Sequence, residues 1–340
     1  MTAFPILDLL EQATAQPGTT DATIKSTGTV AVCRNASVSV TNIPALAESW
    51  SETVAALLPQ RPGDVRQGYT TIVKDANARR YRMTISANRQ GEAISVRPLP
   101  KSIRSPEELR LPDGLKEYFT RLQGGLFLVG GVTGSGKTWT LASLMKARAA
   151  DAGGKFITIE SPIEFEYEDT TTAVFHQREV GVQAVSYSAA LEDALQEKPN
   201  VLMVQEIRRR EEAETVLAAA LSGHVVAASI HAYTASTAPQ RFLGIVSPNL
   251  EDFGARDALA SCLEAVVLQR LIPGFEGLVP IFEVLYFRND RGERLASLER
   301  LVRQGNWVGL RQEMEVSKRF GMLQWEDSLA QRRREGLVPL

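Results

Sequence analysis

The sequence predicts an α/β protein, with a mostly parallel core sheet preceded by a small α+β domain. From about Leu111, short apolar runs alternate with helical stretches, which is typical of buried parallel strands joined by crossover helices. Before residue 98, strand-like segments alternate polar and apolar residues, as in an antiparallel sheet with one solvated face. A glycine-rich loop follows the first apolar run of the core. These three observations define the predicted architecture.

The N-terminal domain is expected to span residues 1–98. It is predicted to begin with a short amphipathic helix over residues 4–11 and to contain a longer helix over residues 46–58. Its predicted strands cover residues 23–25, 29–32, 38–40, 69–73, 80–86 and 93–97.

Three prolines among basic and serine residues, Pro98, Pro100 and Pro106, indicate a linker over residues 99–112. The core is expected over residues 113–288, with strands at 126–129, 156–159, 201–204 and 225–230. A C-terminal subdomain over residues 289–340 is predicted to consist of short helices, at 295–304, at 307–320 and from residue 324 onward.

Composition narrows the range of functions. The chain has 340 residues, a net charge of −2 and 44% hydrophobic residues, which suits two or three globular domains and argues against nucleic acid as a direct ligand. Two cysteines, Cys33 and Cys262, are too few for a disulfide framework and are expected to be reduced thiols in the cytosol. No signal peptide or membrane-length apolar run is expected, so work at a membrane would be peripheral.

The glycine-rich loop is the strongest chemical signal. Backbone N–H groups at such a strand–loop–helix junction cradle phosphates, a lysine reaches the β- and γ-phosphates, and a hydroxyl ligates Mg²⁺. A glycine turn without a ligand is the alternative. The sequence therefore predicts a nucleoside triphosphate site formed by Gly131, Val132, Thr133, Gly134, Ser135, Gly136, Lys137 and Thr138, with Trp139 next on the helix.

Acidic residues follow two of the predicted core strands. Glu160 and Glu164 come at and after the end of one strand, where ligands of open α/β sheets bind, so either could position an attacking water. Glu206 follows the apolar strand 201–204 and is expected to support Mg²⁺ together with Thr138. For Glu160 and Glu164, the alternative is that each is a solvent-exposed residue at the end of a strand, without a catalytic role.

A histidine flanks each end of the predicted strand 225–230. Imidazole can contact or sense a phosphate near pH 7, although a strand-end histidine is more often structural. Only one end of the strand can face the nucleotide. His231 lies at the carboxyl end and is the functional candidate, whereas His224 lies at the other.

Taken together, these segments resemble the PilT/GspE secretion-ATPase superfamily, its PilT branch in particular. Its Walker A, Asp box, Walker B and His box segments correspond to residues 131–138, 159–165, 201–206 and 223–231. Residues 176–180 resemble its Gln-Arg-Glu-Val segment, residues 263–271 its helix before the last strands, and residues 321–324 its Gly-Met turn. The resemblance covers roughly residues 20–335.

The resemblance implies a PAS-like N-terminal domain, a RecA-like P-loop ATPase core and C-terminal helices. It implies a homohexameric ATP- and Mg²⁺-dependent motor in the cytoplasm, peripheral to the inner membrane and docked on a platform or secretion-core protein. Catalytic roles are expected for Lys137, Glu160, Glu206 and His231. Arg82 and Arg97 resemble arginines that reach a neighbouring subunit's nucleotide.

Three positions depart from the pilus members: Ser161 in the Asp box, Gln205 before Glu206, and Arg209 after it. The segment Phe165-Glu166-Tyr167 further resembles DotB/TraJ-like ATPases of type IVB secretion and conjugation. A secretion or conjugation motor is therefore favoured slightly over a pilus retraction motor. A RecA-like DNA motor and a nucleotide-dependent scaffold are the alternatives of other classes. The sequence names neither the machine, the platform partner nor the direction of work.

Overall fold

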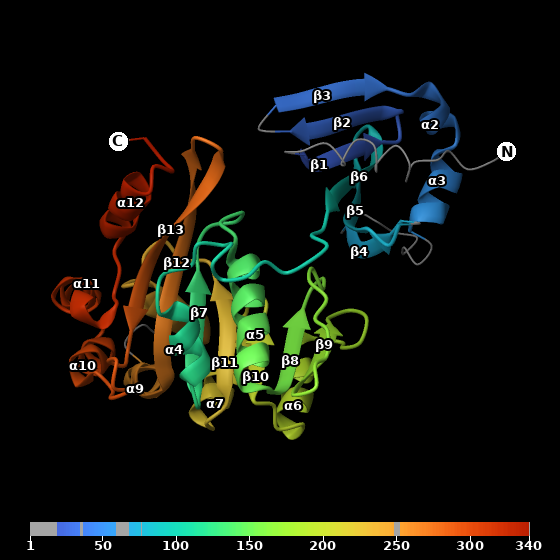
Figure 1. The fold of residues 1–340 in the computed structure, drawn as a ribbon. Coiled ribbons are helices and arrows are strands. Elements are labelled where there is room, and N and C mark those ends of the chain that lie inside the picture. Colours follow the sequence, from blue (N-terminus) through green and yellow to red (C-terminus); the bar gives the residue numbers. More distant parts are fainter. Residues whose placement is uncertain (1–18, 35–36, 59–67, 76, 248–251, 340) are drawn as a thin grey trace. The chain divides into compact units, whose positions relative to one another are not determined.

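The computed structural model describes residues 19–34, 37–58, 68–75, 77–247 and 252–339 (Figure 1). The helix predicted over residues 4–11 lies outside these residues. The chain divides into two compact units. The first comprises Met1–Ser102 together with Pro162–Glu166, and the second comprises Ile103–Ser161 and Tyr167–Leu340.

The first unit contains a six-stranded antiparallel sheet in the order β3-β2-β1-β6-β5-β4. Each predicted strand of this region is confirmed. Alternate residues of β5, such as Tyr81, Met83 and Ile85, are fully buried, while Arg82 and Thr84 lie on the opposite face. The strands are β1 (Thr19–Lys25), β2 (Thr29–Arg34), β3 (Ser37–Asn42), β4 (Tyr69–Lys74), β5 (Arg80–Asn88) and β6 (Gly91–Pro98).

The helix predicted over residues 46–58 is instead two helices, α2 (Pro44–Glu48) and α3 (Trp50–Leu57). Ser49 lies between them, and its hydroxyl donates to the carbonyl oxygen of Ala45 at 2.9 Å. Bonding of a serine hydroxyl to the carbonyl four residues earlier often accompanies a bend, and Ser49 departs from helical geometry, with φ of −104° and ψ of 17°. Leu46, Trp50, Val54 and Leu57 from both helices are buried in the core of this unit.

The second unit is built on a seven-stranded sheet in the order β13-β12-β7-β11-β10-β8-β9. All neighbouring pairs are parallel except β12 and β13. The four predicted core strands are confirmed, whereas β9 and β13 were not predicted. The strands are β7 (Gly125–Gly130), β8 (Gly154–Glu160), β9 (Ala173–Glu179), β10 (Val201–Val204), β11 (Val225–Ile230), β12 (Leu263–Gly274) and β13 (Gly277–Tyr286).

The expectation of a helix over residues 263–271 is wrong, because these residues form most of strand β12. Val266, Val267 and Leu268 are all fully buried, since β12 lies between β7 and β13 with both faces covered. A strand buried on both faces lacks the two-residue alternation of polar and apolar residues, so its periodicity does not distinguish it from a buried helix. The β-branched valines favour the strand.

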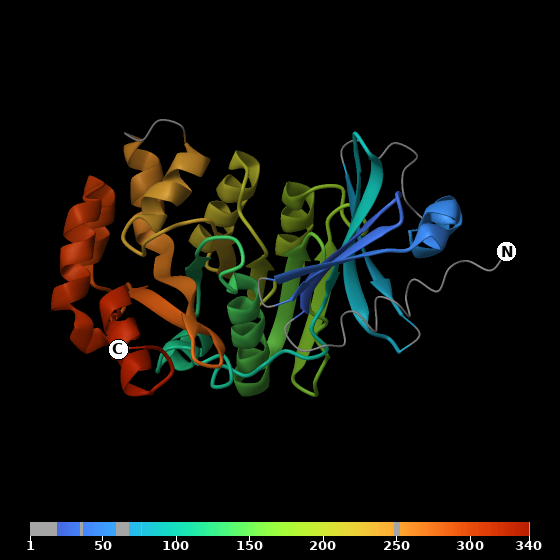
Figure 2. The ribbon, with the colours of Figure 1, turned by 90° about the horizontal axis from the view of Figure 1, so that it is seen from above.

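Helices cover both faces of this sheet. Figure 2 shows α4 and α5 on one side and α6 to α9 on the other. Both α5 and α7 contact β7 and β11, so the strand that leads into the glycine loop lies deep in the core. These helices are α4 (Leu115–Arg121), α5 (Lys137–Ala152), α6 (Tyr187–Gln196), α7 (Arg210–Leu221), α8 (Ala238–Val246) and α9 (Phe253–Cys262).

The C-terminal region is helical, as predicted. It contains α10 (Ala296–Gln304), α11 (Trp307–Val316), the 3₁₀ turn η1 (Lys318–Phe320) and α12 (Trp325–Arg334). α10 contacts α9, and α12 contacts β13. Across the described parts of the chain, none of the helices combines the length and apolarity needed to span a bilayer.

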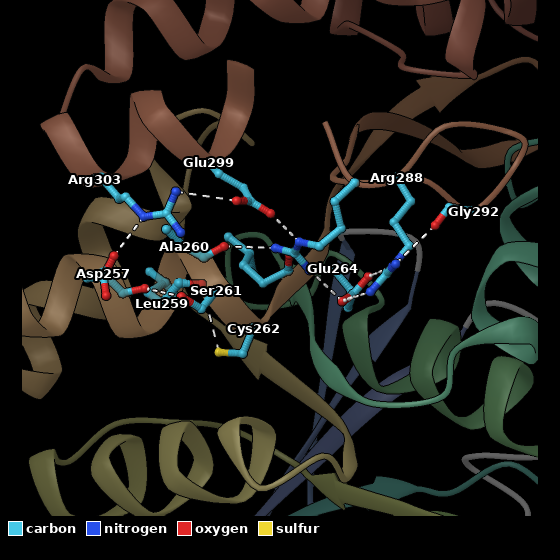
Figure 3. Close-up of polar contacts among 12 residues, drawn as sticks. Asp257, Leu259, Ala260, Ser261, Cys262, Glu264, Arg288, Gly292, Glu299 and Arg303 are labelled. Carbon is cyan, nitrogen blue, oxygen red and sulfur yellow. Dashed lines mark hydrogen bonds and ion pairs between the residues drawn. The ribbon is translucent and has the colours of Figure 1, made fainter. Parts of the chain in front are cut away.

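A network of ion pairs fixes the start of β12 (Figure 3). The buried carboxylate of Glu264 accepts from Arg288 Nε at 2.6 Å and from Arg294 Nη1 at 2.7 Å. Arg294 also pairs with Glu299 and donates to the carbonyl oxygen of Ala260 at 2.8 Å. Because Glu264 has two cationic partners, its charge is compensated although it is buried. The network joins α9, β12 and α10 at the amino end of the strand.

Candidate active site

The glycine loop joins the end of β7 to the first residue of α5. Gly131 has φ of +150°, and a Cβ there would lie 2.5 Å from both the Gln269 carbonyl oxygen and Ser135 Oγ. Gly136 caps α5 with φ of +93°, and its Cβ would lie 2.8 Å from Gln269 Nε2. Glycine is therefore required at both positions, for backbone conformation and for space.

The helix that follows the loop suits an anion. The first turn of α5 carries no acidic residue, so its free N–H groups and dipole present positive potential. Lys137 Nζ donates to the carbonyl oxygens of Gly131 at 2.9 Å and Val132 at 3.1 Å, which holds the ammonium against the loop. Burial lowers the pKa of Lys137 below its ordinary value, against the opposing charge of Glu206. The backbone cradle, dipole and ammonium together fit a phosphate chain.

Glu160 ends β8 and is buried, with 1% of its surface exposed. Its Oε1 accepts from Thr158 Oγ1 at 2.7 Å and from Gln177 Nε2 at 3.1 Å. Gln177 is the register partner of Thr158 on the adjacent strand β9, which explains why it reaches the carboxylate. Sequence reasoning did not select Gln177, although it lies in the segment compared with the Gln-Arg-Glu-Val motif.

Glu206 follows β10 by two residues, and its carboxylate pairs with Arg208 Nη2 at 2.5 Å. That hydrogen bond raises the pKa of the Arg208 guanidinium. Gln205 has a structural role that the sequence did not reveal. Its Oε1 accepts from the Ser161 N–H at 2.6 Å, and its own N–H donates to Ile159 at 3.0 Å. Gln205 therefore joins the carboxyl ends of β8 and β10.

The two histidines lie at opposite ends of β11, as predicted. Ile230 is the register partner of Gly130, and the Gly131 N–H donates to the Ile230 carbonyl at 3.3 Å, so His231 follows directly beside the loop. The His231 ring meets Tyr233 edge-on, with centroids 5.5 Å apart. His224 is at the amino end, where its Nδ1 lies 2.9 Å from Ser222 Oγ.

A pocket of about 600 Å³ adjoins the start of α5. Gly136 and Trp139 line it from the loop side, and Phe275 and Leu278 line it from the β12–β13 hairpin. Arg104 also lines it and stacks its guanidinium over the Trp139 ring, 5.1 Å from the centroid. An aromatic ring and a guanidinium plane are surfaces on which a planar group can stack.

Arg82 and Arg97 lie in the first unit, on neighbouring strands β5 and β6. Arg82 Nη1 pairs with Glu164 Oε1 at 2.5 Å, and Arg97 is exposed. The structure therefore places Glu164 with the first unit, on an arginine. Glu160, Glu206, His231 and the phosphate loop belong to the second unit.

A family model described as "Type II/IV secretion system protein" matches residues 62–277. The chain belongs to this family. One member of similar sequence is the uncharacterized protein YggR of Escherichia coli (strain K12), 32% identical over 77% of each chain. Another is the type IV pilus ATPase PilU of Pseudomonas aeruginosa, 30% identical over 88% of this chain and 77% of its own.

Two solved structures share the fold of this chain. The pilus retraction motor PilT with bound ADP is 27% identical, with a TM-score of 0.82 over 99% of this chain and 95% of its own. The Legionella pneumophila ATPase DotB is 23% identical, with a TM-score of 0.79 over 100% of this chain and 94% of its own. At this identity the similarity shows the fold alone. The predicted α/β ATPase fold is thereby confirmed. The PAS-like assignment of the first unit stays a prediction.

Proposed function

We propose that this chain is an ATP-hydrolysing subunit of a homohexameric motor. The observation that carries the proposal is the arrangement at one edge of the second unit's sheet. The phosphate loop with Lys137 follows β7, His231 follows the adjacent strand β11, and Glu160 ends β8 in the same parallel sheet. Carboxyl ends of parallel strands share one edge, which is where ligands of such sheets bind.

Each side chain has a role that its position supports. The loop amides and Lys137 hold the β- and γ-phosphates. Thr138, second in α5, and Glu206, close enough to Lys137 to influence its pKa, would hold Mg²⁺, which supplies charge compensation when bound. Glu160, oriented by Thr158 and Gln177, positions the attacking water. His231 senses the γ-phosphate.

The proposal also covers binding of the nucleobase of ATP and contacts between neighbouring subunits of the hexamer. Trp139 and Arg104 offer the nucleobase a stacking surface in the pocket beside the loop. Arg82 and Arg97 act in trans, on the nucleotide of a neighbouring subunit, where a guanidinium compensates developing charge. Rotation of the N-terminal domain during the cycle then does mechanical work.

The motor is proposed to work in the cytoplasm, on the inner face of a bacterial inner membrane, against a platform or secretion-core protein. A secretion or conjugation machine is one setting. The second candidate is type IV pilus retraction, which is favoured by the 30% identity to PilU and 32% identity to the retraction ATPase PilT of Pseudomonas aeruginosa. Neither setting requires a small-molecule substrate other than ATP.

The proposal is tested with the purified full chain. Phosphate release from ATP is measured with Mg²⁺ and with excess EDTA, and the particle mass is measured with and without nucleotide. We expect Mg²⁺-dependent turnover and a sixfold mass. Nucleotide-dependent assembly without turnover would identify a scaffold instead. Salt-sensitive DNA binding that stimulates turnover would identify a DNA motor.

A further inference from the structure

Five residues just after Glu160, the proposed water-positioning glutamate, belong to the first unit although the chain on either side of them belongs to the second. Ser161 and Tyr167 belong to the second unit, whereas Pro162–Glu166 belongs to the first. We name these five residues the coupling segment. It begins two residues after Glu160, so the polypeptide itself connects the N-terminal unit to that carboxylate.

The coupling segment is held by β5. The Arg80 guanidinium, 8% exposed, donates to the carbonyl oxygens of Ile163 and, at 3.1 Å, Glu164. Arg82 Nη1 pairs with the Glu164 carboxylate at 2.5 Å. Arg80 and Arg82 are two residues apart on one strand, so both point from the same face of the sheet. Glu166 adds an ion pair with Lys74 at 3.1 Å. The segment is thus attached through backbone and side chain alike.

Residues of the second unit on either side of the segment are bonded to one amide, the side chain of Gln177. Gln177 Nε2 donates to Glu160 Oε1 at 3.1 Å, and Gln177 Oε1 accepts from the Tyr167 N–H at 3.0 Å. The residue before the segment is also fixed, because the Ser161 N–H donates to Gln205. A displacement of the segment therefore pulls on the amide that orients the Glu160 carboxylate.

We propose that Glu164 is a positioning residue that couples the N-terminal unit to Glu160. Its ion pair with Arg82 makes the coupling segment move with the first unit, and Gln177 transmits that movement to the carboxylate. Hydrolysis is then fast only when the N-terminal unit holds the segment in place. This inference rests on the proposed role of Glu160, and it adds a means by which domain position controls turnover within one subunit.

The test uses Glu164→Gln in the full chain, with Glu168→Gln as matched control, since Glu168 is an exposed glutamate beyond the segment. Steady-state ATP hydrolysis gives kcat and KM separately, and hydrogen–deuterium exchange reports on residues 161–167 and on α5. In Glu164→Gln we expect kcat to fall about 10-fold with KM for ATP unchanged, less than the ~10² that a 1 Å misplacement costs. Exchange should rise in 161–167 and stay unchanged in α5.

The outcomes separate the inference from the proposed function. A wild-type chain without turnover contradicts the function, whereas the exchange measurement still tests the attachment of the segment. Unchanged kcat in Glu164→Gln, or unchanged exchange in residues 161–167, overturns the coupling. A raised KM with unchanged kcat overturns it too, because Glu164 would then act in nucleotide binding.

Discussion

Arg82 and Arg97 are direct cross-strand partners on β5 and β6. Like charges directly opposite each other destabilise a sheet unless another group compensates them. Glu164 compensates Arg82, while Arg97 is exposed. The exposed Arg97 guanidinium, beside Arg82, is therefore the one suited to an anionic ligand outside its own unit.

If Arg97 acts in trans, two inactive variants should complement each other. Arg97→Ala subunits retain an intact phosphate loop, and Lys137→Ala subunits retain an intact arginine. Mixed rings should therefore recover part of the ATPase activity that each variant lacks alone. Arg89→Ala, an exposed arginine of the β5–β6 turn, serves as control and should be fully active alone. No recovery at any ratio, in rings shown to contain both variants, would refute the trans role.

His231→Ala should lower kcat by about 10-fold or more, and clearly more than His224→Ala. The reason is register, because Ile230 pairs with Gly130 next to the loop while His224 lies at the far end of β11. The measurement is steady-state ATP hydrolysis by both variants at equal protein concentration. Equal losses of kcat in the two variants would show that a histidine's function does not depend on which end of β11 it occupies.

Removing the centre of the ion-pair network should be costly for stability. In Glu264→Ala, Arg288 and Arg294 lose their buried partner, and we expect the free energy of unfolding to fall by about 3–5 kcal/mol. Glu214→Gln breaks the exposed pair with Arg210 and should cost about 0–1 kcal/mol. Urea unfolding at one fixed protein concentration measures both. Similar costs for the two variants would mean that the network contributes no more than a surface pair.

The phosphate loop could be predicted because its chemistry is local. Glycine spacing, the preceding apolar strand and the following helix all lie within one stretch of sequence, and Gly131 and Gly136 have the conformations that only glycine tolerates easily. The carboxyl-end rule then located Glu160 and His231 without any tertiary contact.

Other features depend on contacts between segments distant in sequence. The family resemblance implied a helix over residues 263–271, and burial on both faces of β12 removes the two-residue alternation that would have indicated a strand instead. The hydrogen bond from Gln177 to Glu160 depends on the β8–β9 register, and the attachment of Glu164 to Arg82 spans 82 residues. No local pattern encodes these contacts.

Glu160→Gln should leave ATP binding intact and lower kcat by about 10²–10³. The amide preserves shape but is a poor acceptor for the proton of an oriented water. KM, or the affinity for a fluorescent ATP analogue, should change little, and Glu168→Gln should behave as wild type. Wild-type turnover in Glu160→Gln would show that another carboxylate positions the attacking water.

The central claim, that the loop of residues 131–138 is the site of ATP hydrolysis, is tested most directly by Lys137→Ala. Phosphate release by this variant is compared with that of the wild type and of Lys116→Ala, which removes only a surface pair with Asp151. We predict at least a ~100-fold loss of kcat in Lys137→Ala and none in Lys116→Ala, because the ammonium compensates charge that develops on the phosphates. Undiminished turnover in Lys137→Ala would contradict the assignment.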